Sequence, residues 1–267
     1  MTDGVLFCIA SSAVVPLRKQ PREQAEMVNQ CLLGEISEVL SIDGRWVEVV
    51  TEFDNYHGWV SKNQVILLNQ TQKMQYVSER MLKRSPFATF RVHNKIESRM
   101  VPPGALVDFG EEEISIHQFT GKPETALRSV KGNDIIETAM FFLGTPYLWG
   151  GRTDFGIDCS GLVQTVYLLH DVALPRDSSQ QAQAKPYKSN DIKDAEKGDL
   201  IYFAFDGGGV SHVGFYVGNG TLLHASASVC LQNIDPRKRF ENPYPLNNRL
   251  SEAIVGIQSP FSPKESF

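Results

Sequence analysis

The first part of the chain alternates short hydrophobic runs with turn residues. Residues 36–40 and 46–50 are rich in valine and isoleucine and flank an Asp-Gly turn, and a third run follows at 58–60. Short strands at a spacing of about ten residues are typical of small β-barrels. The pattern therefore predicts a small barrel over residues 1–70.

The next segment, residues 71–128, has a weaker pattern. Leu106–Phe109 and Ile114–Ile116 have the alternation of strands, and a Pro-Pro-Gly turn precedes them. We interpret the segment as a second, degenerate barrel. The alternative is a long irregular linker, which is uncommon at this length.

A different pattern begins at Asp134. Apolar residues recur at helical spacing from Ile135 to Leu143, and Gly-Thr-Pro then ends the predicted helix. A second apolar helix is predicted to begin at Cys159. Strand-like runs follow at 198–203, 211–217, 222–226 and 253–257. Helices followed by an antiparallel sheet indicate an α+β domain, which we assign to residues 129–267.

Composition narrows the function classes. A length of 267 residues predicts two or three modules. The net charge of −5 favours neither nucleic-acid binding nor a basic membrane-binding patch. No apolar run reaches the roughly 18 residues of a membrane span, and the run at 5–15 lacks the preceding basic residues of a signal peptide. We therefore expect a cytoplasmic monomer, with secretion as the less favoured alternative.

The four cysteines are expected to be free thiols. They stand at positions 8, 31, 159 and 230, and none forms a C-x-x-C pair, so neither a zinc site nor a redox pair is predicted. No metal or organic cofactor is expected. Cys159 differs from the others because it begins a predicted helix, where backbone N–H groups and the helix dipole lower the pKa of a thiol.

A cysteine nucleophile needs a base within hydrogen-bond reach and a third group that orients the base. His212 and His224 lie on two predicted strands joined by Gly-Asn-Gly. A three-residue loop would pair Gly214 with His224 and set His212 diagonally beside it on the same face, whereas a two-residue turn would separate the histidines. A shared catalytic role therefore predicts the three-residue loop, with a left-handed glycine at its end.

Several motifs resemble two known families. Gly-x-Trp-x-x-Val at 44–49 and Tyr-x-Gly-Trp-Val at 56–60 resemble the bacterial SH3 (SH3b) domain. Tyr-x-Trp-Gly-Gly at 147–151, Asp-Cys-Ser-Gly at 158–161 and Ser-His-Val-Gly at 211–214 resemble the NlpC/P60 cysteine peptidases. The resemblance implies an α+β papain-like catalytic domain preceded by one or two small SH3b β-barrels.

The resemblance also implies roles for individual residues. Cys159 would be the nucleophile, His212 the general base and His224 the orienting residue, while Tyr147 would lie near the oxyanion. An SH3b domain ahead of such a domain looks like the γ-D-glutamyl-L-diamino acid endopeptidases, which recycle murein tripeptides or tetrapeptides that carry a free N-terminal L-Ala.

The free amine of such a substrate needs acceptors, because an unpaired buried charge is costly. The residues expected to contact the substrate are Asp158, Ser160, Asp177 and Ser178 in the catalytic domain and Tyr56 and Glu26 in the SH3b domain. Simpler interpretations exist: Asp158 caps a helix, and Tyr56 packs in its barrel. Two rival functions also stay open, a non-catalytic wall-binding module and an acyltransferase on the same fold.

Overall fold

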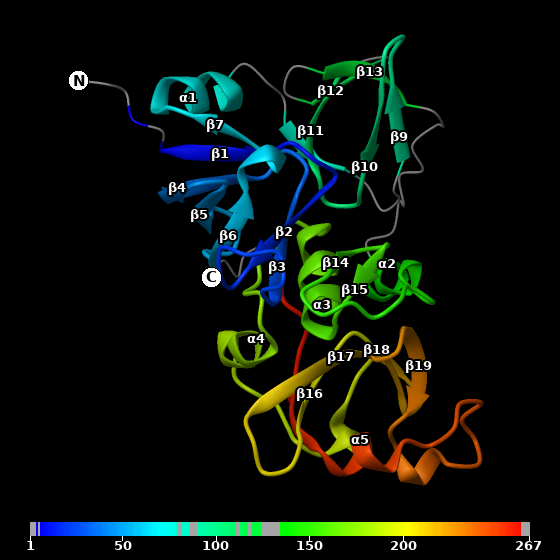
Figure 1. The fold of residues 1–267 in the computed structure, drawn as a ribbon. Helices are drawn as coiled ribbons and strands as arrows, with labels where there is room; N and C mark the ends of the chain where they lie inside the picture. Colours follow the sequence, from blue (N-terminus) through cyan, green and yellow to red (C-terminus); the bar gives the residue numbers. More distant parts are fainter. Residues whose placement is uncertain are drawn as a thin grey trace. The chain divides into compact units, whose positions relative to one another are not determined.

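The computed structural model describes residues 4, 6–78, 82–85, 90–110, 113–116, 119–123 and 134–262. The chain divides into two compact units, residues 1–130 and 131–267. In Figure 1 the N-terminal unit runs from blue to green and the C-terminal unit from green to red. Within the described ranges, no helix has the length and apolar character needed to cross a membrane.

The first sheet of the N-terminal unit has seven antiparallel strands in the order β3-β2-β6-β5-β4-β1-β7. The strands are β1 (Phe7–Ala10), β2 (Val14–Arg18), β3 (Met27–Leu32), β4 (Ile36–Asp43), β5 (Trp46–Thr51), β6 (His57–Ser61) and β7 (Val65–Leu68). Alternate residues of β2 and β5 point inward, so that Leu17, Val47 and Val49 are completely buried. The three strands predicted between residues 36 and 60 are confirmed as β4, β5 and β6.

A second sheet follows the helix α1 (Gln70–Ser78). Its strands are β8 (Leu82–Arg84), β9 (Phe90–His93), β10 (Ser98–Val101), β11 (Leu106–Phe109), β12 (Ile114–Ile116) and β13 (Phe119–Pro123). The two strands predicted in this segment are thus confirmed as β11 and β12. Leu106 N donates to Leu33 O at 2.8 Å, which ties the second sheet to the first. Its identity as a degenerate SH3b barrel stays a prediction.

The C-terminal unit is a five-stranded antiparallel sheet covered by helices, in the strand order β19-β18-β17-β16-β20. Its strands are β16 (Leu200–Ala204), β17 (Val210–Gly218), β18 (Thr221–Ala225), β19 (Val229–Asn233) and β20 (Ile254–Gln258), with a small pair β14 (Arg152–Thr153) and β15 (Gly156–Ile157). Its helices are α2 (Ile135–Phe141), α3 (Cys159–Leu168), α4 (Ser178–Ala184) and α5 (Asn248–Glu252).

Helix α3 is the centre of this unit. All ten of its residues are buried, and the polar members Ser160, Gln164 and Thr165 form hydrogen bonds within the unit. Leu162, Val163 and Val166 share one core with residues of β16, β17 and β18. The helix begins at Cys159, as predicted, and this packing fixes the position of the cysteine against the sheet.

The β17–β18 hairpin confirms the predicted register but corrects the predicted turn. Phe215 pairs with Leu223 and Tyr216 with Leu222, so Gly214 falls opposite His224. The connection is not a three-residue loop, because Gly218 pairs with Thr221 across a two-residue Asn-Gly turn whose residues both have positive φ. Val217 forms a bulge, and this extra residue restores the register that a two-residue turn alone would have lost.

Gly214 is required by the close approach of the two strands. A Cβ at this position would lie 2.8 Å from His224 Cβ and 2.9 Å from Leu223 O. We expect Gly214→Ala to lower the free energy of unfolding by about 1–3 kcal/mol, which corresponds to a fall of roughly 2–4 °C in Tm per kcal/mol. Thermal unfolding measures this change.

The matched control is Gly209→Ala, because a Cβ at Gly209 would have no atom within 4 Å. Its Tm should equal that of the wild type. Equal Tm values for both variants would contradict the assigned crowding at Gly214.

Candidate active site

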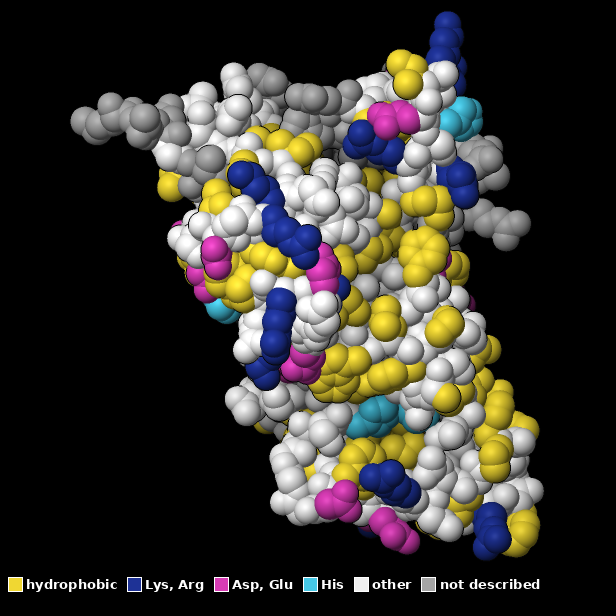
Figure 2. Space-filling view, in the orientation of Figure 1, with side chains coloured by type: hydrophobic (Ala, Val, Ile, Leu, Met, Phe, Trp, Pro, Cys, Tyr) yellow, Lys and Arg dark blue, Asp and Glu magenta, His cyan; other side chains and the backbone are white. Residues whose placement is uncertain are grey.

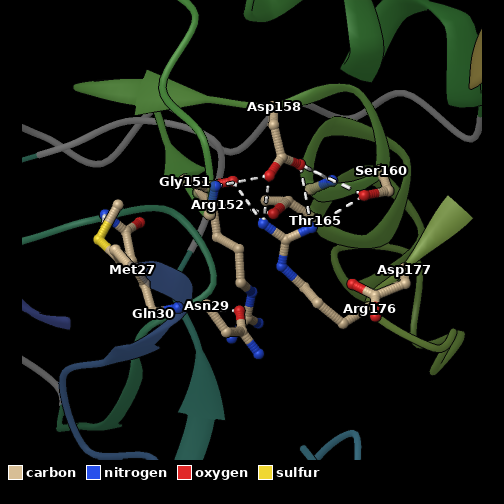
Figure 3. Close-up of polar contacts among 12 residues, drawn as sticks. Met27, Asn29, Gln30, Gly151, Arg152, Asp158, Ser160, Thr165, Arg176 and Asp177 are labelled. Carbon is tan, nitrogen blue, oxygen red and sulfur yellow. Dashed lines mark hydrogen bonds and ion pairs between the residues drawn. The ribbon is translucent and has the colours of Figure 1, made fainter. Parts of the chain in front are cut away.

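A buried ion pair organises the start of helix α3. Arg176 Nη1 donates to Asp158 Oδ1 at 2.9 Å and Arg176 Nη2 donates to Asp158 Oδ2 at 2.6 Å. The side chains are 1% and 7% exposed, respectively. Such a two-point contact fixes both the distance and the orientation of the carboxylate. Figure 3 shows Asp158 with this guanidinium on one side and Gly151 and Ser160 beside it.

The carboxylate of Asp158 also holds two backbone segments. Its Oδ1 accepts from Gly161 N at 2.7 Å, which caps helix α3 as expected, and its Oδ2 accepts from Gly150 N at 2.8 Å. A Cβ on Gly161 would approach Gly151 O to 2.2 Å. The glycines of the Trp-Gly-Gly and Asp-Cys-Ser-Gly motifs therefore let the loop and the helix touch through their backbones.

Ser160 and helix α4 complete this frame. Ser160 Oγ accepts from Arg176 Nη1 at 2.9 Å and donates to Asp158 Oδ1 at 3.3 Å. Gln181 of α4 donates from Nε2 to Ser160 O at 3.0 Å. The two residues that flank Cys159 are thus each held by buried side chains, and Cys159 itself has little freedom to move.

The side chain of Cys159 is buried in an apolar environment. Burial raises its pKa to about 12, and the negative charge of Asp158 adds to the rise. The N–H groups of Val213 and Ser160 and the charge of Arg176 act in the opposite direction. The prediction of a lowered pKa is therefore wrong for the free site, because desolvation outweighs the helix N-terminus.

His212 and His224 form the pair that the hairpin register predicts. His212 Nε2 and His224 Nδ1 are 2.7 Å apart, and the two rings meet edge to face. Burial lowers the pKa of His212 to about 3, with a further lowering by His224, and burial also lowers the pKa of His224. Both rings are therefore neutral near pH 7. Val213, whose N–H faces the Cys159 thiol, directly follows His212 on β17.

Two amide side chains set the proton positions in this pair. Asn247 Nδ2 donates to Gln232 Oε1 at 2.8 Å, and the same oxygen lies 3.0 Å from His224 Nε2. With the Gln232 amide in this orientation, His224 must carry its proton on Nε2 and accept from His212 through Nδ1. His212 then carries its proton on Nε2, and its Nδ1 is left as the basic atom.

Tyr147 is held beside the cysteine by its own backbone. Its N–H donates to Ala227 O at 3.0 Å, and the residue forms a parallel bridge with Ile157. Burial raises the pKa of the phenol to about 12, with further contributions from Cys159 and Asp158. The hydroxyl therefore keeps its proton at neutral pH and is available as a hydrogen-bond donor next to the thiol.

The other predicted contacts are placed as follows. Asp177 is the N-cap of α4, with its N–H donating to Gln180 Oε1 at 3.4 Å, and Ser178 is the first residue of that helix. In the N-terminal unit, Tyr56 packs against the core of the first sheet. Glu26 Oε2 lies 3.5 Å from Lys19 Nζ. For all four residues, contact with substrate stays a prediction.

Sequence reasoning missed several residues of the site, among them Asn247 and Gln181. Arg176 directly precedes Asp177 and Ser178 in the sequence, and nothing in the sequence indicates that its side chain is buried. Gln232 belongs to β19, a strand that was not predicted. Cys230 was expected to be a free thiol without a role in the site, yet its Sγ lies 3.8 Å from His224 Nε2.

Comparisons with known proteins agree with this geometry. The sequence profile of the NlpC/P60 family matches residues 144–245, and that of the bacterial dipeptidyl-peptidase Sh3 domain matches residues 17–65. The γ-D-glutamyl-L-lysine dipeptidyl-peptidase of Bacillus subtilis is 32% identical over 216 residues, which cover 73% of this chain and 71% of the relative. The chain belongs to the NlpC/P60 family.

Two further comparisons cover nearly the whole chain. Dipeptidyl-peptidase 6 of Lysinibacillus sphaericus is 27% identical over 284 residues, which cover 95% of this chain and 99% of the relative. The crystal structure of an NlpC/P60 family protein from Bacillus cereus has the same fold, with a TM-score of 0.76, 22% identity and coverage of 94% of this chain and 98% of that one. The chain of 267 residues is therefore itself a cysteine peptidase with an N-terminal SH3b domain.

The lowered pKa of His212 predicts a pH-dependent stability. The unfolded chain binds a proton at a histidine pKa near 6.5, whereas folded His212 binds it only near pH 3. Between these values the unfolded state holds more protons, so the free energy of unfolding falls as the pH is lowered through this window. In urea titrations from pH 7 to 4, His212→Asn should reduce that slope by up to about 1.4 kcal/mol per pH unit. Identical slopes would contradict the buried neutral imidazole.

The proton positions predict different effects for two substitutions of Gln232. Gln232→Leu removes the acceptor that fixes His224, and we expect kcat/KM to fall roughly tenfold or more. Gln232→Glu keeps an acceptor and adds a negative charge, which raises the histidine pKa values and moves the acid limb of the pH–kcat/KM profile to higher pH. A leucine variant with the wild-type profile would contradict the assigned proton positions.

Proposed function

We propose that the chain hydrolyses the bond between γ-D-glutamate and the diamino acid in murein tripeptides or tetrapeptides that carry a free N-terminal L-Ala. The observation that carries this proposal is the 2.7 Å contact between His212 and His224 next to the buried thiol of Cys159. The bond is suggested by relatives named γ-D-glutamyl-L-lysine dipeptidyl-peptidases. We further propose that the reaction serves recycling of wall peptides in the cytoplasm.

In the proposed first half-reaction, the proton of the Cys159 thiol moves to Nδ1 of His212 as sulfur attacks the γ-carbonyl carbon. The neutral ground state of both groups fits a transfer that accompanies the attack. The Tyr147 hydroxyl and backbone N–H groups at the start of α3 donate to the developing oxyanion. His212 then gives its proton to the leaving amine, the C–N bond breaks, and a thioester remains on Cys159.

The second half-reaction returns the site to its starting state. His212 takes a proton from water, whose oxygen attacks the thioester carbon, and the C–S bond breaks. The sulfur regains the proton from His212, and L-Ala-D-Glu leaves as the free acid. His224 keeps the ring of His212 in place through both steps, because its Nδ1 accepts a hydrogen bond from His212 Nε2 throughout.

The substrate ammonium is proposed to bind on the side of the Cys159 thiol that faces away from the two histidines. Asp158 and Ser160 flank Cys159, and Asp177 and Ser178 begin helix α4, whose Gln181 donates to Ser160 O. The carboxylate of Asp158 supplies the counter-charge, although Arg176 already engages both of its oxygens. Tyr56 and Glu26 are the contributors proposed from the N-terminal unit.

The decisive test compares L-Ala-γ-D-Glu-meso-diaminopimelate with its N-acetylated form by mass spectrometry. The wild type should release L-Ala-D-Glu from the free-amine peptide only, and Cys159→Ala should release nothing. Cys8→Ala, which removes a free thiol of β1 in the N-terminal unit, is the matched cysteine control and should retain activity.

Two results would change the proposal. Cleavage of both peptides would retain the peptidase and remove the amine-binding roles of Asp158, Ser160, Tyr56 and Glu26. Absence of cleavage, with a covalent acyl adduct that passes to an amine or alcohol, would instead identify an acyltransferase.

A further inference from the structure

A cavity of about 200 Å³ lies on the histidine side of the site, within the C-terminal unit. It is lined by His212, His224, Phe205, Ser226, Asn247 and Arg249. Figure 2 shows histidine atoms in a hollow of this face, with hydrophobic side chains around them and a basic side chain beneath. Cys159, Asp158 and Arg176 do not line it, so the cavity is separate from the proposed amine-binding side.

The position of His212 indicates what the cavity would hold. This inference rests on the proposed function, in which His212 protonates the leaving amine. That amine belongs to the diamino acid, so the diamino acid must lie next to His212 when the bond breaks. The cavity shares His212 as a wall and therefore offers space for the rest of the diamino acid.

Arg249 lines the cavity, and Asp206 lies beside Arg249 without lining the cavity itself, so a positive and a negative side chain are both near this end. The guanidinium carbon of Arg249 lies 4.7 Å from the centroid of the Phe205 ring, which supports it in a cation–π contact. Arg249 Nη2 is 4.0 Å from Asp206 Oδ2, and these side chains are 75% and 93% exposed. Neither charge is therefore neutralised by a buried partner, and both can turn toward a ligand.

Each group fits a different part of one ligand. A guanidinium can donate two parallel hydrogen bonds to a carboxylate. A carboxylate next to it can accept from an ammonium, and the Phe205 ring offers apolar surface to a methylene chain. A diaminopimelate side chain has a methylene chain that ends in one carboxylate and one ammonium. A lysine side chain ends in an ammonium alone, which would leave Arg249 without a partner and close to a like charge.

We propose that Arg249, Asp206 and Phe205 form the subsite for the side chain of the diamino acid, and that this subsite prefers a side chain ending in an amino acid head group over one ending in a simple amine. The chain would then differ in substrate preference from its relatives named for L-lysine. Because the two charged groups are exposed, the expected preference is moderate, about tenfold in kcat/KM.

The test measures kcat/KM for L-Ala-γ-D-Glu-meso-diaminopimelate and for L-Ala-γ-D-Glu-L-Lys. The wild type should favour the first peptide about tenfold. Arg249→Leu should bring the ratio near one, mainly through a higher KM for the diaminopimelate peptide. Asp206→Asn should lower the ratio in the same direction by a smaller factor.

The matched control is Arg239→Leu. Arg239 is also exposed and stacks on a phenylalanine, with its guanidinium carbon 5.7 Å from the centroid of the Phe240 ring, but it does not line the cavity. Its ratio should equal that of the wild type. Equal Tm values for the two leucine variants would show that a change in ratio is not a loss of folding.

The outcomes separate this inference from the proposed function. Cleavage of both peptides with a ratio near one, unchanged by Arg249→Leu, overturns the subsite and retains the peptidase. If neither peptide is cleaved, the proposed function fails, and calorimetric Kd values of both peptides for Cys159→Ala still decide the subsite. Equal Kd values would overturn it, whereas a preference for the diaminopimelate peptide that Arg249→Leu removes would support it.

Discussion

The buried ion pair between Arg176 and Asp158 is the interaction on which the rest of the site depends. Through one carboxylate it connects the capped start of α3, the Gly150 loop and the guanidinium that also holds Ser160. Removing charges from water is expensive, and a buried pair recovers that cost only when every lone pair is satisfied. Asp158 meets this condition, because each of its oxygens accepts at least two hydrogen bonds. The frame therefore holds the residues on both sides of Cys159 and fixes the position of its backbone.

The second principle of the site is that its reactive groups rest in their neutral forms. Burial raises the pKa of Cys159 and lowers the pKa of His212, so an ion pair does not persist in the free site. The chain of hydrogen bonds from Asn247 through Gln232 to His224 nonetheless orders the proton positions in advance. Such an arrangement separates orientation, which the fold supplies permanently, from charge, which appears only when a carbonyl is attacked.

Sequence reasoning reached those parts of the structure that local patterns encode. The start of α3 at Cys159 and the strands around residues 36–60 follow from spacing and turn residues. The register that joins His212 to His224 was predicted from a shared catalytic role, because the turn residues alone allow two registers. The bulge at Val217 was missed because two different turns can produce the same register, and only the strand pairing distinguishes them. Arg176 and Gln232 were missed for another reason: a polar residue shows no sign in the sequence that tertiary packing will bury it. The lowered thiol pKa was wrong because the helix N-terminus is local, whereas desolvation depends on the whole fold.

A double-mutant cycle on Asp158 and Arg176 tests the central claim most directly. It measures the free energy of unfolding of Asp158→Asn, Arg176→Met and the double variant by urea titration. Because each single variant leaves one buried group without its partner, each should lose about 3–5 kcal/mol. The double variant should lose less than the sum of the two by roughly 1–3 kcal/mol. Strictly additive losses would contradict the account, because the two residues would then support the site independently.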